Sequence, residues 1–203
     1  IYSLFVITIQ ARNRQETLDF NRMLRDEVKD RVEKGIAALA TERCRLITDT
    51  PPPFYFLNLY NHAAKYGAVF VGSEYTFFLA AAWRFLEDGS WGPAKSLKEM
   101  GISFRNREDV FRFLAKWQDE HWHGACFYMP DIRMELNARL VKEWHANGAL
   151  LHLNRGCEGM SQFQMEHRLG LMKTGFPVAT FEGNFGDKRE LDERQVLDRI
   201  DSF

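Results

Sequence analysis

The clearest periodic pattern in the chain lies in residues 16–40. Its apolar positions recur every fourth residue, with charged residues on the opposite side: Phe20, Leu24, Val28, Val32 and Ile36. This spacing predicts an amphipathic helix. The apolar stretch before it, residues 1–9, lacks the basic start and small-residue cleavage site of a signal peptide. We therefore expect it to be a secondary-structure element cut from a longer chain.

Four short runs between turn residues predict strands, and the second of them is typical of a strand that is covered on both faces. They occupy residues 44–48, 68–71, 149–153 and 177–181. Helical spacing predicts intervening helices at residues 54–66 and 160–173, and a final helix at residues 191–203. Three consecutive prolines at residues 51–53 must interrupt any regular element after the first strand.

Strands that alternate with helices predict an α/β fold with a parallel sheet, Rossmann-like or flavodoxin-like, in the strand order 2-1-3-4. Between the second and third strands we expect a helical insertion at about residues 75–147. It would hold one helix at residues 75–87, a second after a cap formed by Asn106 and Asp109, and a third that opens at Pro130. Residues 1–42 would pack as an N-terminal segment on an α/β domain of residues 43–203.

Composition narrows the classes of partner. The chain has 203 residues with 27 basic and 28 acidic side chains, so charge gives no reason to expect nucleic acid. No apolar run approaches the roughly 18 residues of a membrane span. Three cysteines cannot all pair with one another, which favours a reducing compartment, and we expect the cytoplasm.

Ligands of open parallel sheets bind outside the carboxyl ends of the strands, and the loop after the third predicted strand carries the most unusual residues there. These are Asn154, Arg155, Gly156, Cys157 and Glu158. The N–H groups of a following helix would favour the thiolate of Cys157, the form that attacks electrophiles or binds metal. The alternative is that Cys157 is a small buried apolar residue, as most free cysteines are.

The loop after the fourth predicted strand, residues 182–189, is rich in glycine and charge. Asp187 or Arg189 could face a substrate there. Alternatively, the loop is a solvated turn in which Asp187 caps the next helix.

Other candidate residues favour structural roles. His121, His123 and Cys126 suggest zinc, but residues two apart on a helix point in different directions and no second pair completes the site. We expect His152 to be a core residue or a support behind the site rather than a catalyst, and Cys44 to be structural like Cys126. The histidines on predicted helices are expected at the surface or in packing: His62, His145 and His167. An aromatic cluster is either core or a contact surface for a homodimer: Phe54, Tyr55, Phe56 and Tyr60.

The last third of the chain resembles a known family. The segments that carry the likeness are HLNRGCEG (152–159), GFPVATFEGN (175–184), DKR (187–189) and DRIDSF (198–203). They are similar to the carboxyl-terminal half of 2-hydroxyacyl-CoA dehydratase and benzoyl-CoA reductase subunits, and the reductase branch looks closer. In that family a strand ends in an Arg-x-Cys loop, and a Gly-x-Pro turn leads to a strand that ends in an acidic loop.

The resemblance implies a low-potential electron-transfer enzyme that acts on an acyl-CoA thioester. It implies a four-iron four-sulfur cluster with Cys157 as one ligand, and surroundings formed by Asn154, Arg155, Gly156, Glu158, Asp187 and Arg189. A second family subunit and an ATP-driven electron activator would be the partners. The other cluster cysteines of the family belong to a preceding domain, so the resemblance implies an inactive isolated chain.

A second interpretation belongs to another class of protein. The chain would be an excised or redesigned α/β scaffold, acting as a binding or self-associating module without catalysis. In that case the aromatic cluster near Phe54 and Tyr60 would form the interface.

Overall fold

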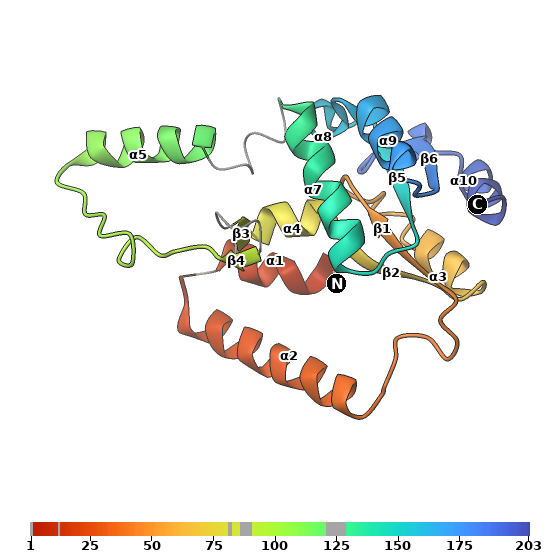
Figure 1. Ribbon diagram of the computed structural model, residues 1–203, viewed down its shortest axis with the longest axis horizontal. Helices are drawn as coiled ribbons and strands as arrows, with labels where there is room; N and C mark the ends of the chain where they lie inside the picture. Colours follow the sequence, from red (N-terminus) through yellow and green to blue (C-terminus); the bar gives the residue numbers. More distant parts are fainter. Residues whose placement is uncertain (1, 12, 81–82, 86–90, 121–128) are drawn as a thin grey trace.

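A four-stranded parallel sheet forms the centre of the molecule in the computed structural model, which describes residues 2–11, 13–80, 83–85, 91–120 and 129–203 (Figure 1). Its strands are β1 (Cys44–Thr48), β2 (Ala68–Ser73), β5 (Gly148–Asn154) and β6 (Val178–Gly183). They are ordered β2-β1-β5-β6 and all pair in parallel. The predicted α/β class and the order 2-1-3-4 are therefore confirmed.

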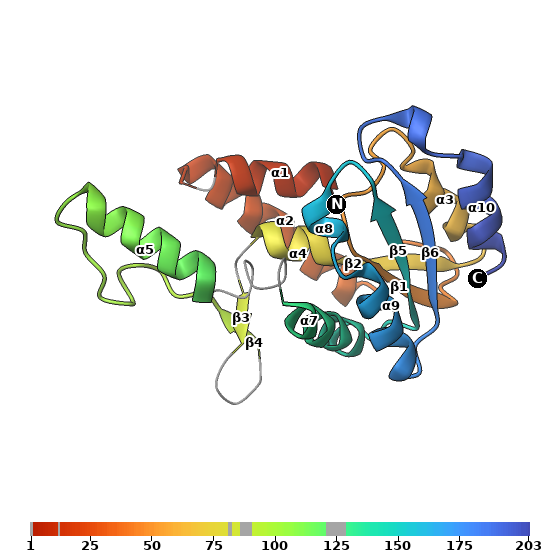
Figure 2. The same ribbon diagram turned by 90° about the horizontal axis from the view of Figure 1, so that it is seen from above.

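Helices cover both faces of the sheet (Figure 2). One face packs against α3 (Asn58–Ala64) and α10 (Glu193–Asp201), and the other against α7 (Pro130–Glu143) and α9 (Gln164–Lys173). Side chains of β5 alternate between these two layers: Leu150 joins the first, while Ala149 and Leu151 join the second. This two-sided burial explains why β5 is an almost uninterrupted apolar run.

The edge strand β2 is held by an unusually close contact at Gly72. The ring of Trp144, which follows α7, lies against the backbone there, and a Cβ atom built on Gly72 would lie 1.6 Å from the ring. Glycine is therefore required at this position because any side chain would displace the indole.

The segment between β2 and β5 contains helices and an additional small sheet. Its helices are α4 (Glu74–Ala80), α5 (Arg107–Glu120) and α7, while β3 (Trp83–Phe85) and β4 (Trp91–Pro93) pair antiparallel. The predicted helix at residues 75–87 is wrong in its second half, since α4 ends at Ala80 and β3 follows. The cap before α5 forms as predicted: the Asp109 N–H donates to Asn106 Oδ1 at 2.9 Å. In Figure 1, α5 extends far from the sheet.

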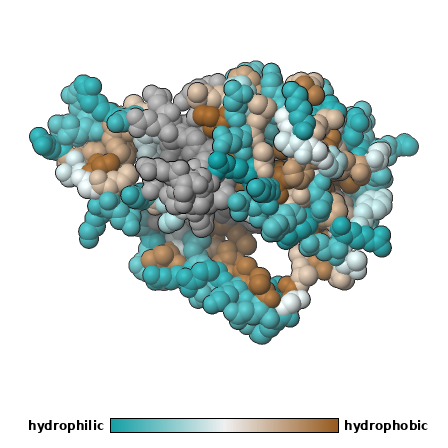
Figure 3. Space-filling model, in the orientation of Figure 1, coloured by the Kyte–Doolittle hydropathy of each residue, from teal (hydrophilic) through white to brown (hydrophobic). Residues whose placement is uncertain are grey.

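Two helices precede the sheet, α1 (Tyr2–Gln10) and α2 (Gln15–Glu33). The predicted helix reached residue 40, but α2 ends earlier because Gly35 adopts a positive φ of 65°. Val28, Val32 and Ile36 are exposed. Figure 3 shows an opening between α2 and the rest of the molecule, bordered by hydrophobic residues. Packing of residues 1–42 on the domain stays a prediction.

The other helix boundaries differ from the expected ones. The helix expected at residues 54–66 is limited to α3, and the final helix to α10, which follows a short 3₁₀ helix η1 (Lys188–Glu190). The helix expected at residues 160–173 is divided into α8 (Glu158–Ser161) and α9. The break lies at Phe163, whose φ of 58° is incompatible with a continuous right-handed helix. Within the described ranges, no helix is both long and apolar enough to cross a membrane.

Candidate functional site

The loops that follow β1, β5 and β6 meet at the carboxyl edge of the sheet. Two backbone hydrogen bonds join them: Phe54 N–H donates to the Phe185 carbonyl at 3.2 Å, and Arg155 N–H donates to the Gly183 carbonyl at 2.8 Å. Segments more than 100 residues apart in the chain are thus brought side by side. This is the edge at which ligands of parallel sheets bind.

Asn154 fixes the loop after β5. Its side chain is fully buried, and Oδ1 accepts hydrogen bonds from Gly156 N–H at 3.0 Å and from Phe185 N–H at 3.2 Å. Ser161 secures the same residue, since its hydroxyl donates to the Asn154 carbonyl and accepts from the Asn154 N–H. One buried amide therefore couples the loop after β5 to the loop after β6.

Asn184 plays the corresponding role in the loop after β6. Its Oδ1 accepts from the N–H groups of Gly186 and Asp187 at 2.9 and 3.1 Å. The Tyr55 hydroxyl donates to the Asn184 carbonyl at 2.8 Å, which ties in the loop after β1. A Cβ atom on Gly156 would lie 2.5 Å from Asn184 Oδ1, so only glycine lets the two loops approach this closely.

Cys157 lies at this edge, at the start of the four-residue helix α8, and is half-buried. It packs beside Tyr75 against the cluster formed by Leu136, Leu140 and Met160. Burial, and secondarily the nearby Cys157, raise the pKa of Tyr75. The sequence placed Cys157 correctly at the edge of the sheet, but the long helix expected behind it is interrupted after one turn.

The charged residues of the two loops form surface ion pairs. Arg155 pairs with Glu182 across β5 and β6, and Arg189 Nε donates to Asp187 Oδ1 at 2.9 Å. Hydrogen bonds from Arg189 lower the pKa of Asp187 to about 2. Asp187 also accepts from the Arg189 N–H as the cap of η1, which agrees with the solvated-turn interpretation.

A network of buried charged and polar side chains lies beneath the loops. Arg133, from α7, is the central residue: its Nε lies 3.0 Å from Glu74 Oε1, and its Nη2 lies 3.8 Å from Asp49 Oδ2. Asn137 donates to Glu74 Oε2 at 2.8 Å, and Gln164 donates to Asp49 Oδ2 at 3.1 Å. These five side chains are at most 7% exposed, so the network is enclosed by protein.

Burial changes the protonation of this network. Two carboxyl groups share one guanidinium, and desolvation raises the pKa of Glu74 despite the neighbouring Arg133. Burial also lowers the pKa of His152, and it lowers that of His167 far below the usual value, assisted by the positive charge of Arg133. Burial therefore shifts each of these three groups toward its neutral form, relative to the unfolded chain.

The sequence analysis missed this network. Asp49 and Glu74 directly follow β1 and β2, so their position at the carboxyl ends of strands was a usable signal. Nothing local indicates that Arg133, on a helix 84 residues after Asp49, completes it.

The histidines and most of the aromatic residues occupy structural positions. His152 is 1% exposed, stacks on Phe181 and contacts the Pro51 carbonyl through Nδ1 at 2.8 Å, so the core assignment is confirmed. His62 and His145 lie toward the surface, and His167 is fully buried. In the aromatic cluster Phe56 is buried and Tyr60 packs edge-on to Phe70. His121, His123 and Cys126 lie outside the described residues, so the structure does not test the zinc hypothesis.

The donor set at the edge does not by itself suit an iron–sulfur cluster, which needs several thiolates. Two cysteines are described, and they lie at opposite ends of parallel strands: Cys44 begins β1, whereas Cys157 follows β5. Burial raises the pKa of Cys44, which disfavours its thiolate form. No group of three or more histidine, cysteine or acidic residues in the described ranges could hold a metal.

Comparison with known proteins gives the family. The sequence model described as "2-hydroxyglutaryl-CoA dehydratase, D-component" matches residues 1–203. The chain belongs to this dehydratase family. The resemblance stated from residues 152–203 is thereby confirmed.

Several curated members of the dehydratase and reductase group are similar to the chain at low identity. The (R)-phenyllactyl-CoA dehydratase alpha subunit of Clostridium sporogenes is 24% identical over 98% of this chain. The (R)-2-hydroxyisocaproyl-CoA dehydratase alpha subunit of Clostridioides difficile is 23% identical over 98%, and a benzoyl-CoA reductase subunit of Thauera aromatica is 22% identical over 100%. The chain spans less than half of these relatives, 43% to 44% of their lengths.

Proposed function

We propose that this chain is part of a subunit of an enzyme that acts on acyl-CoA thioesters, by 2-hydroxyacyl-CoA dehydration or aromatic acyl-CoA reduction. The observation that carries the proposal is the Cys157 loop, held at the ligand-binding edge of the sheet by Asn154 in a chain of this family. The relatives named above are two dehydratase alpha subunits and one reductase subunit, and the family model is that of a dehydratase.

The finer proposal concerns electron transfer. Cys157 would supply one thiolate to a four-iron four-sulfur cluster, while the other thiolates would come from the preceding domain that the resemblance implies. The surroundings would be Asn154, Arg155, Gly156, Glu158, Asp187 and Arg189. An ATP-driven activator would deliver low-potential electrons in the cytoplasm. The chain on its own would then be inactive.

Iron content of cysteine variants tests this role. The full-length subunit is produced without oxygen, together with any subunit that co-purifies, because this chain alone would supply only one thiolate. Iron and acid-labile sulfide are measured beside the visible spectrum. We expect Cys157→Ser to lose iron and sulfide, whereas the matched control Cys44→Ser keeps them, because Cys44 lies at the opposite edge of the sheet. Equal iron in both variants would contradict the proposal.

The second candidate function is that of a self-associating module. The observation that favours it is the exposure of two large apolar side chains. Phe54 is 45% exposed and Leu57 is 37% exposed, whereas Tyr55 is hydrogen-bonded inside the loops. If this surface forms a homodimer, changing both exposed residues to serine converts it to monomer in analytical ultracentrifugation. An unchanged mass would reject this interface.

A further inference from the structure

Arg133 contacts the far end of the Cys157 loop as well as the buried carboxyl groups. Its Nη1 donates a hydrogen bond to the Gln162 carbonyl at 2.7 Å, while its Nε lies 3.0 Å from Glu74 Oε1. The side chain is 2% exposed, so both contacts are shielded from water. One buried guanidinium therefore joins α7 to the residue after α8 and to the first residue of α4.

The short helix between Cys157 and Gln162 depends on such an anchor. α8 is one turn long, and the Ser161 N–H donates to the Cys157 carbonyl at 3.2 Å. A helix of one turn is not stable by itself in water. The chain then turns at Phe163, whose φ of 58° is strained for a residue with a side chain and persists only where neighbouring contacts impose it. The hydrogen bond from Arg133 to the preceding carbonyl is one of these contacts.

A second contact holds the same turn from the side of α9. Gln164 Nε2 donates to Asp49 Oδ2 at 3.1 Å, and Asp49 Oδ1 accepts from the His152 N–H of β5 at 2.8 Å. Asp49 is completely buried, and Gln164 is 7% exposed. The residues on both sides of Phe163 are therefore tied to the buried network, one through Arg133 and the other through Asp49.

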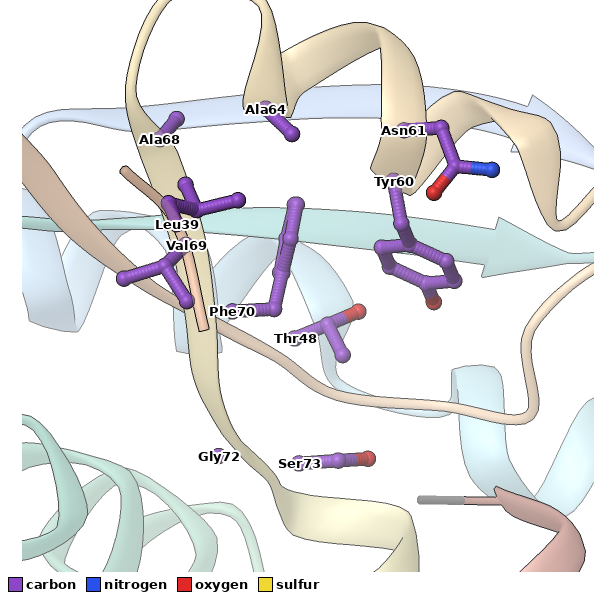
Figure 4. A pocket seen from close by; sticks show the side chains of 10 residues that line it. All are labelled: Leu39, Thr48, Tyr60, Asn61, Ala64, Ala68, Val69, Phe70, Gly72 and Ser73. Atoms are coloured by element: carbon purple, nitrogen blue, oxygen red, sulfur yellow. The ribbon is translucent and has the colours of Figure 1, made fainter. Parts of the chain in front are cut away.

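The register of the sheet brings the two carboxyl groups of the network together. Thr48 and Ser73 pair at the ends of β1 and β2, and both line a cavity on the α3 face of the sheet (Figure 4). Asp49 and Glu74 follow them directly. Successive side chains of an extended chain point to opposite faces, so these two reach the face on which α7 carries Arg133.

Tyr75, which packs beside Cys157, is placed by the same pair of residues. Its N–H donates to the Asp49 carbonyl at 2.8 Å, and it directly follows Glu74, whose carboxyl group contacts Arg133. The helix α8 and this tyrosine are the two neighbours of the thiol that come from the loops. The contacts that hold them both meet at one arginine.

We propose that Arg133 is a positioning residue for Cys157. It acts on the two structures beside the thiol, α8 and Tyr75, and so keeps the thiol packed at the carboxyl edge of the sheet. The proposal rests on the function proposed above, in which Cys157 supplies the thiolate of the site. It gives the buried network a role in that site, although none of the network's side chains belongs to the Cys157 loop.

Alkylation of Cys157 by iodoacetamide tests the proposal in the full-length subunit, treated with a chelator so that no iron blocks the thiol. Mass spectrometry of the peptides gives the rate at each cysteine. Arg133→Lys keeps the positive charge beside the two carboxyl groups but loses the planar fork that contacts two acceptors at once. We expect it to raise the Cys157 rate about fivefold or more, because α8 loses a hydrogen bond from a charged donor. Cys44, at the opposite edge of the sheet, should keep its rate.

Arg139→Lys is the matched control. Arg139 lies on the same helix and pairs with Glu135 at the surface, so Cys157 should react as it does in the wild type. Low concentrations of urea separate a local opening of α8 from unfolding of the whole domain. The excess rate from a local opening changes little with urea, whereas the rate from global unfolding rises steeply.

Gln164→Met serves as a second variant if Arg133→Lys gives no cooperative melting transition. It removes the hydrogen bond to Asp49, leaves the arginine in place, and should raise the Cys157 rate about two- to tenfold. A Cys157 rate within about twofold of wild type in the folded variants, an equal rise at Cys44, or a steep dependence on low urea would overturn the proposal. Iodoacetamide needs neither iron nor CoA, so a failed iron experiment would leave this result intact.

Discussion

Replacing Glu74 with glutamine tests how the buried charge network is balanced. Glu74 is 1% exposed and contacts Arg133 Nε at 3.0 Å and Asn137 Nδ2 at 2.8 Å, while Asp49 competes for the same guanidinium. Glutamine has nearly the same shape and keeps one carbonyl acceptor, but it carries no charge and cannot titrate.

The sign of the effect follows from the raised pKa. Because burial raises the folded-state pKa of Glu74 above the usual 4.5, the native protein binds this proton more tightly than the unfolded chain does. As pH rises between those two pKa values, the wild-type free energy of unfolding decreases by up to about 1.4 kcal/mol per pH unit. Glu74→Gln lacks this decrease. Its weakened contact with Arg133 or Asn137 costs about 1–3 kcal/mol at every pH.

Urea unfolding followed by circular dichroism, at constant ionic strength from about pH 5 to pH 8, measures the difference between the two proteins. Glu74→Gln should be the less stable protein at the acidic end and should recover relative to wild type as pH rises. Because the pKa values of His152 and His167 are lowered, the free energy of unfolding also decreases as pH falls below 6.5. This decrease is the same in both proteins, so it cancels in their difference. A difference that stays constant or widens with pH would refute the reasoning, because attraction to Arg133 would then exceed the desolvation of Glu74.

Three further predictions concern the edge strand and the loops. Gly72→Ala should lower the free energy of unfolding by about 3 kcal/mol, since its methyl group would lie 1.6 Å from the Trp144 ring; a loss below about 1 kcal/mol in urea unfolding would contradict that contact. Asn154→Ala should cost about 1–3 kcal/mol and speed hydrogen exchange of the two N–H groups that donate to its side chain; unchanged exchange would reject the coupling of the loops. Arg189→Ala should raise the Asp187 pKa from about 2 toward 3.8 in an NMR titration, and an unmoved value would assign the shift to another group.

Local patterns were sufficient for much of the sheet. The first strand, Cys44–Thr48, was predicted residue for residue because an apolar run lies between a polar link and three prolines. Helix ends were harder to predict. The first predicted helix continued past Gly35, whose positive φ terminates α2. The helix predicted at residues 160–173 continued through Phe163, whose positive φ separates α8 from α9. Periodicity reports which face is apolar, but it does not report a single residue with unusual backbone geometry.

The edge loops were predicted only in outline. The fold rule placed Cys157 at the carboxyl edge, because the position of strands determines where their loops lie. It could not indicate that Asn154 and Asn184 join the loops, or that Glu74 and Arg133 pair beneath them. These contacts connect residues 31 to 129 positions apart, a distance over which the pattern of apolar residues carries no information.

The buried network has a consequence for the order in which the chain folds. Asp49 contacts residues 103 and 115 positions later, so its partners arrive only after β5 and α9 have been synthesised and docked. Long loops must close before such contacts form, which slows folding. A collapsed intermediate that buried Asp49 or Glu74 without Arg133 would contain an unpaired charge and would be strongly disfavoured. These groups thus discourage premature compaction, because only the native arrangement of β1, β2, β5, α7 and α9 brings both carboxyl groups to the guanidinium of Arg133.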